Sequence, residues 1–233
     1  MLKEILRLFK KSDFFMEAHQ EACRMIRWDR QMFENASAIL RGKPIPHPKI
    51  DVYKKERSVD KAIREIRKKI LIHLSVSEPV DAPASIVLLD IALDLERIGD
   101  YTTNIAEIAD HAPNKLEAGV LDSDLQEVEE HASHYFQVIA TVFERYDKDL
   151  IQEIISKRIP HKCDELLNRL ISEDLVMTQQ NAVVLALYIR YLKRVVSHLL
   201  DIAKTLIQPF DRARFFPKNI PNNRNTKGKD QTR

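Results

Sequence analysis

The sequence predicts an all-α protein of two tandem three-helix bundles, with six long helices in total. Apolar residues recur at intervals of three and four along most of the chain, which is the spacing of a buried helical face. Glycine is rare, with four among 233 residues, and most prolines lie between the periodic segments. No segment of any length alternates with the two-residue period of a strand.

Three helices are expected in the first half, over about residues 13–41, about 50–76, and a third segment that ends near residue 111. Gly42 and three prolines that follow it end the first helix. Residues 77–85 contain two prolines and are predicted to form a turn. Pro113 and Asn114 end the third helix, so residues 112–121 are expected to connect the two bundles.

The second half repeats this layout, with helices expected over about residues 122–147, 149–174 and 178–208. Pro160 lies inside the second of these, where it is expected to kink or break the helix. The predicted division of the chain is an amphipathic lead (1–12), a first bundle (13–111), a connection (112–121), a second bundle (122–209) and a basic tail (210–233). The tail is poor in apolar residues, particularly after Ile220, and is expected to be disordered.

The charge distribution and the cysteines restrict the function classes. The net charge of +2 hides a tail, 211–233, with seven Lys or Arg against two Asp, so residues 1–210 sum to −3. A mildly acidic body argues against nucleic-acid binding. The sequence contains no run of about twenty apolar residues, so no transmembrane helix is predicted. The first residues of the chain lack the apolar core of a signal peptide. Cys23 and Cys163 have no partner spacing, which favours reduced thiols and a cytoplasmic protein.

The segment 93–110 carries an acidic stripe beside its apolar face. Glu96, Asp100 and Asn104 follow one another at intervals of four, and Gly99 lies between the two acids. Like charges one turn apart repel, and a glycine costs a helix roughly 1 kcal/mol relative to alanine. This pattern indicates a bound positive group or a closely passing helix. The alternative is a solvated acidic stripe with an incidental glycine.

A second acidic pair, Glu56 and Asp60, lies in the preceding helix. Consecutive helices of a short-loop bundle are antiparallel neighbours. Asp60 and Asp100 lie about twenty residues before and after the turn, so the two pairs are expected at the same height.

Four converging carboxylates, Glu56, Asp60, Glu96 and Asp100, would repel one another unless protonated or bound to a cation. Oxygen-only ligation favours hard or borderline ions such as iron, magnesium, manganese or calcium, with zinc as a further candidate. The alternative is that Arg57, Arg64 and Arg97 neutralise the group and that no metal binds.

A shift of 97 residues places the sixth expected helix on the third and indicates an internal repeat. The apolar frame and an arginine survive the shift: Leu95, Arg97, Ile98, Ile105 and Ala106 fall on Leu192, Arg194, Val195, Ile202 and Ala203. The acidic stripe does not survive, because Glu96 falls on Lys193 and Asp100 falls on Ser197. Lys193 is therefore a candidate internal cation on the second bundle.

The run Asp94-Leu-Glu-Arg-Ile-Gly-Asp100, continued by Asn104-Ile-Ala-Glu107, resembles the signature of the PhoU family of phosphate-uptake regulators. The acidic pair at 56–60, followed by Glu65, and the Glu-Pro-Val turn are similar to that family as well. The resemblance implies two three-helix bundles, a homodimer and metal binding, as an ion or cluster, through Glu/Asp-x-x-x-Asp pairs. The matching positions are Glu56 with Asp60 and Glu96 with Asp100. The erased second stripe marks a divergent member with a degenerate second repeat.

The resemblance implies a non-enzymatic cytoplasmic regulator of phosphate transport and phosphate signalling, located at or near the inner face of the membrane. Its partners would be a phosphate transporter subunit or a sensor kinase, and its metal would be iron, zinc or magnesium. Two alternatives remain open at this stage: a metal-dependent phosphate-ester hydrolase, and a metal-free helical dimerisation module.

Overall fold

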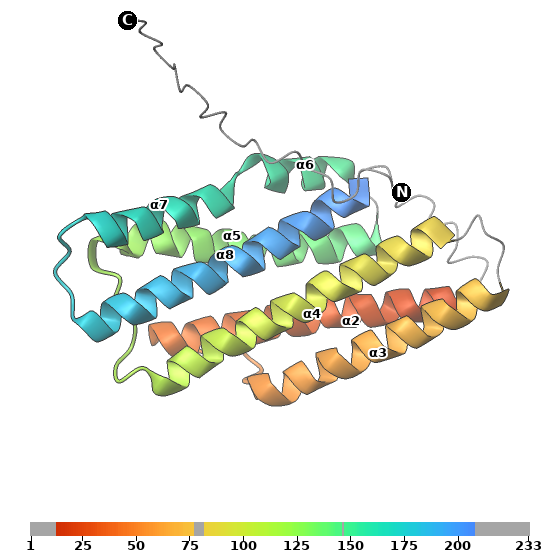
Figure 1. Ribbon diagram of the computed structural model, residues 1–233, viewed down its shortest axis with the longest axis horizontal. Helices are drawn as coiled ribbons and strands as arrows, with labels where there is room; N and C mark the ends of the chain where they lie inside the picture. The colour runs from red at the N-terminus through yellow and green to blue at the C-terminus, as the bar shows by residue number, and fades with distance from the viewer. Residues whose placement is uncertain (1–12, 77–81, 146, 208–233) are drawn as a thin grey trace, which may run out of the picture.

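The computed structural model describes residues 13–76, 82–145 and 147–207, and its helices are labelled in Figure 1. The predicted lead (1–12) and tail (210–233) lie outside the described residues. Within the described ranges the chain is all-α, with no strand, as the sequence predicts. The helices are α2 (Asp13–Arg41), α3 (Val52–Val76), α4 (Ala82–His111), a 3₁₀ turn η2 (Gly119–Leu121), α5 (Asp122–Glu144), α6 (Lys148–Ser156), α7 (Ile159–Ser172) and α8 (Gln179–Ile207).

Helices α2, α3 and α4 form the first unit, and each runs opposite to the helix before it (Figure 1). The apolar face of α2 carries fully buried side chains, including Phe15, Met25 and Phe33. The helix ends at Gly42, which adopts a φ of 64°, a left-handed conformation that glycine takes without steric cost. Helix α4 packs against both α2 and α3.

The second unit consists of α5, the broken pair α6–α7, and α8. The expected break in the fifth helix is confirmed: α6 ends at Ser156, and Arg158 takes a left-handed φ of 50°. Pro160 then lies in the first turn of α7, where its missing N–H costs the helix no hydrogen bond. The proline therefore starts a new helix just past the break.

The ends of α4 and the connection differ in detail from the expected ones. Helix α4 already begins at Ala82 and includes Pro83 in its first turn, a position that tolerates proline. The connection 112–121 buries Leu116, Ala118 and Leu121 in the core. Leu116 also donates its amide hydrogen to the carbonyl of Leu40 at 2.9 Å. The connection is thus packed against the bundle rather than looped out from it.

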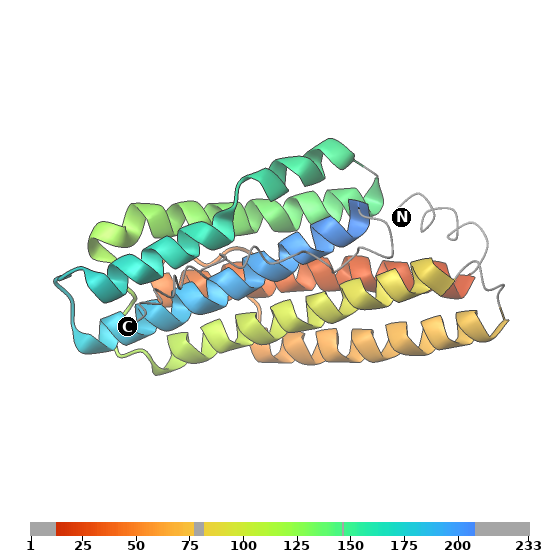
Figure 2. The ribbon, with the colours of Figure 1, turned by 45° about the horizontal axis from the view of Figure 1, so that its top comes forward.

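The two units share one continuous apolar core. Helices α4 and α8 lie side by side in both views (Figures 1 and 2), and α2 packs against α5. At the α4–α8 contact, Nδ1 of His198 lies 3.2 Å from Oδ1 of Asp94, and the His198 ring stacks on Tyr101 at 5.7 Å.

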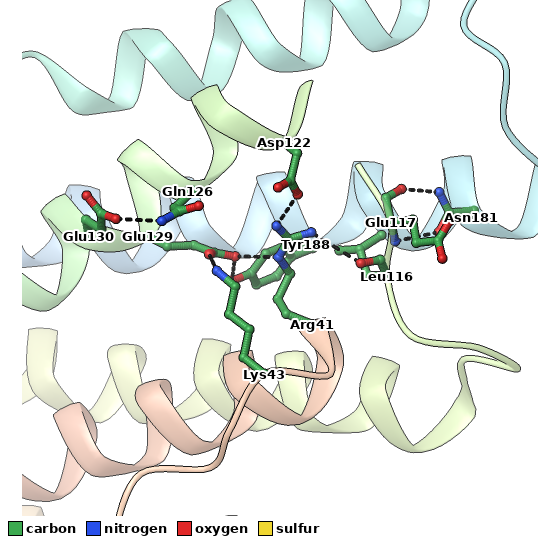
Figure 3. A network of polar contacts seen from close by, with 10 residues as sticks. All are labelled: Arg41, Lys43, Leu116, Glu117, Asp122, Gln126, Glu129, Glu130, Asn181 and Tyr188. Carbon is green, nitrogen blue, oxygen red and sulfur yellow. Dashed lines mark hydrogen bonds and ion pairs between the residues drawn. The ribbon is translucent and has the colours of Figure 1, made fainter. Parts of the chain in front are cut away.

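A polar network joins the units where α2 ends (Figure 3). Glu129 accepts hydrogen bonds from Lys43 at 2.7 Å and from the Tyr188 hydroxyl at 2.8 Å. Arg41 pairs with Glu129 at 3.1 Å and with Asp122. These contacts link the C-terminal end of α2 and the residues just after it to α5 and α8.

Candidate functional site

Helices α3 and α4 bring three of the four predicted metal ligands together. Glu56 and Asp60 lie on α3, and Asp100 lies on α4. The pKa of the Glu56 carboxyl is raised by partial desolvation, and then by the negative charges of Asp60 and Asp100. The pKa of Asp100 is raised in the same way, by desolvation and then by Asp60. A mutual rise in pKa is the signature of carboxylates that share a site without enough compensating positive charge.

Nearby arginines only partly offset this repulsion. Arg57 lowers the pKa of Glu56, and Arg97 lowers that of Asp100, yet each remains above its ordinary value. The arginines therefore do not fully compensate the negative charge at these two carboxylates, contrary to the alternative in which they neutralise all four acids. The site retains an excess of negative charge.

Glu96, the fourth predicted ligand, points to a different partner. Its Oε2 lies 3.4 Å from Nη2 of Arg67 on α3. The sequence pattern indicated Arg57, Arg64 and Arg97 as neutralising residues, and it did not indicate Arg67. In this arrangement Glu96 is part of an interhelical ion pair beside the other three carboxylates.

Asp29 on α2 is the site residue that sequence reasoning missed. Its side chain is 0% exposed, and neither carboxylate oxygen has a hydrogen-bond partner among the described residues. Burial raises its pKa well above the ordinary value, and the charge of Asp100 raises it further. A signal was present in the sequence, because Asp29 stands on the apolar stripe of α2, four residues after Met25 and three before Met32.

Gly99 of α4 lies next to Asp29. A Cβ atom at position 99 would be 3.4 Å from Oδ1 of Asp29 and 3.5 Å from Cγ1 of Val59. The glycine of the acidic stripe is thus explained by a close approach of α4 to α2 and α3. We refer to Asp29, Glu56, Asp60 and Asp100 as the acidic cluster.

The acidic cluster suits a hard cation by its chemistry, although no closed ligand shell is formed. Carboxylate oxygens are the ligands that magnesium, calcium and manganese prefer. A buried carboxylate without a partner is costly unless it is protonated or paired with a cation. Across the described ranges, no group of three or more His, Cys, Asp or Glu side chains is placed so that it could hold a metal ion.

The cavity beside the inter-unit network is a weaker candidate site. It measures about 540 Å³, and its lining includes Arg41, Lys43, Glu129 and His134. Arg41 is already paired with Asp122 and Glu129, and Lys43 is paired with Glu129. Its two principal cations are thus held by carboxylates of the protein and are not presented to an anionic ligand.

The cysteines behave as the sequence predicts. Both thiols are free, and burial raises the pKa of Cys23 to about 11 and that of Cys163 to about 12. They are neutral at physiological pH, so neither is an activated nucleophile or a ready thiolate ligand.

Fold and site together define a class: a helical-bundle protein made of two related units, with an acidic face on the first. Residues 22–109 match the family model of the PhoU domain, which includes α3, nearly all of α4 and the whole acidic cluster. This match confirms the predicted resemblance to the PhoU family for residues 22–109. PhoU proteins are regulators rather than enzymes, which agrees with the non-enzymatic prediction.

Two solved structures share the fold. The crystal structure of PhoU from Pseudomonas aeruginosa aligns with a TM-score of 0.72 and 19% identity, over 83% of this chain and 95% of that one. The phosphate transport system regulatory protein PhoU from Streptococcus pneumoniae aligns with a TM-score of 0.65 and 17% identity, over 84% of this chain and 95% of that one. No curated protein sequence matches the chain. None of the described helices is long and apolar enough to cross a membrane.

Proposed function

We propose that this protein is a non-enzymatic regulator of inorganic phosphate transport that acts through protein contacts made by the acidic face of α3 and α4. The PhoU domain match over residues 22–109 supports this assignment. The fold shared with a protein described as a phosphate transport system regulator also supports it. The partner would be a transporter subunit or a sensor kinase at the cytoplasmic face of the membrane, and the regulator would act as a homodimer.

The acidic face binds a metal ion or cluster through Glu56, Asp60 and Asp100, with Glu96 as a further ligand once it leaves Arg67. Asp29 supplies negative charge from beneath. The single observation that carries this part of the proposal is the fully buried, unpartnered carboxylate of Asp29 next to Gly99. Iron, zinc and magnesium are the candidate ions.

Phosphate uptake in cells tests the regulatory role. A strain that lacks the protein should show altered uptake of labelled phosphate when external phosphate changes, and the wild-type chain should restore control. The variant Glu56→Gln/Asp60→Asn/Asp100→Asn should fail to restore it. The control Glu130→Gln removes an exposed charge from α5, away from the acidic face, and should restore control fully. Unaltered uptake in the deletion strain would favour a purely structural dimer module instead.

Assay of the metal-loaded protein against generic phosphate esters separates the regulator from the hydrolase alternative. A regulator gives no turnover above that of the free metal ion. Turnover that disappears in the triple variant would support the hydrolase.

A further inference from the structure

The internal repeat carries one ion pair twice, with its charges exchanged. In the first unit, Arg67 of α3 pairs with Glu96 of α4 at 3.4 Å. In the second unit, Asp164 of α7 pairs with Lys193 of α8, whose Nζ lies 2.5 and 2.6 Å from the two carboxylate oxygens. Within each pair, the two residues are 29 positions apart in the sequence. The 97-residue shift places Arg67 on Asp164 and Glu96 on Lys193.

Two of the three remaining positions of the acidic face have lost their carboxylates in the second unit. The same shift places Asp60 on Lys157 and Asp100 on Ser197. Glu56 alone falls on another acid, Glu153, which lies 3.5 Å from His134 of α5.

The glycine of the acidic stripe is also replaced in the second unit. Gly99 corresponds under the shift to Val196, whose side chain is fully buried. The position that lies next to Asp29 in the first unit thus carries a buried apolar side chain in the second.

We propose that Lys193 is an internal cation that takes the place of a bound metal on the second unit. Its ammonium group contacts both oxygens of Asp164, and such charge-assisted bonds are about twice as strong as neutral ones. The Asp164 carboxylate on the α7–α8 face is therefore already paired with a cation of the protein, and each chain binds metal on the α3–α4 face only. This inference rests on the proposed function for what the first face holds.

Paramagnetic broadening of backbone amide signals by Mn²⁺ tests the inference on the full-length protein. Mn²⁺ should broaden the amides of α3 and α4 around the acidic cluster and leave those of α7 and α8 sharp. Broadening around Asp164 in the wild type would overturn the inference. This arm does not depend on the folding of any variant.

The double variant Lys193→Glu/Ser197→Asp restores the acidic pair of the first unit at the corresponding positions. It should gain a second zone of broadening on α7 and α8 and bind one further equivalent of Mn²⁺. The control Arg190→Glu/Ser172→Asp places the same change of charge on exposed positions of the same two helices and should gain neither. A double variant that gains nothing, or a control that gains as much, would overturn the inference.

The outcomes also distinguish this inference from the proposed function. If Mn²⁺ leaves α3 and α4 sharp in the wild type but broadens α7 and α8 in the double variant, the first metal site fails and the role of Lys193 stands. If both units are broadened in the wild type, the first metal site stands and the role of Lys193 fails.

Discussion

Replacing Asp29 with asparagine should remove a pH-dependent cost to the stability of the metal-free protein. The buried carboxyl has a pKa well above its ordinary value of 3.8, so it holds a proton in the folded state at a pH where the unfolded chain has lost it. The folded state then binds more protons, and stability is greatest below the unfolded pKa and falls as pH rises towards the folded pKa. Each pH unit in that window costs about 1.4 kcal/mol.

That slope is measurable by thermal unfolding of the metal-free protein over a series of pH values. A cost of about 1.4 kcal/mol lowers the Tm of a chain of this size by about 3–6 °C. The Asp29→Asn variant keeps the shape of the side chain and cannot ionise, so its Tm should fall less steeply with pH than that of the wild type. The exposed control Glu107→Gln should follow the wild type. Parallel curves for the wild type and Asp29→Asn would refute the reasoning.

Three further predictions concern the inter-unit network, a buried histidine and metal binding. Glu129→Ala should destabilise the protein by about 1–3 kcal/mol in denaturant unfolding, because the buried Tyr188 hydroxyl loses its carboxylate acceptor, whereas the exposed Glu130→Ala should change stability by less than about 0.5 kcal/mol. Burial lowers the pKa of His19 from 6.5 to about 4. The neutral side chain therefore contributes folding stability that is fully present above pH 6.5 and is lost as pH falls through 4. In the His19→Gln variant the free energy of unfolding should no longer show the part of its fall towards acidic pH that His19 causes, which is on the order of 3 kcal/mol. An unchanged pH dependence in the variant would contradict this role of His19. Mn²⁺ affinity measured by calorimetry should increase with pH as the raised carboxyl groups of the acidic cluster lose their protons, and affinity that is flat with pH would contradict their role as ligands.

The helices could be predicted from the sequence because each depends on a local pattern. Apolar periodicity and the stop at Gly42 define α2 without knowledge of the rest of the chain. Pro160 similarly predicts a break in the fifth helix. The position of the break required the structure, since Arg158 rather than the proline takes the left-handed conformation.

The acidic cluster could be predicted only in part because its members come from three helices. The pairs on α3 and α4 follow from spacing and from antiparallel neighbours. Asp29 requires knowing which face of α2 meets Gly99, and this depends on packing between distant segments. The ion pair that holds Glu96 also escaped prediction, because the choice between Arg64, Arg67 and Arg97 depends on side-chain directions across the interface of α3 and α4.

The ion pair with exchanged charges could be predicted only in part from the internal repeat. The shift of 97 residues made Lys193 a candidate cation, but it did not name the carboxylate that the lysine would contact. The structure supplies Asp164, at the position that corresponds to Arg67.

Anomalous scattering from crystals of the wild-type protein grown with manganese would locate a metal ion bound to the acidic cluster. We expect an anomalous peak between α3 and α4, in contact with carboxylates of the acidic cluster. An absent peak at saturating metal, or a peak away from the acidic cluster, would contradict it.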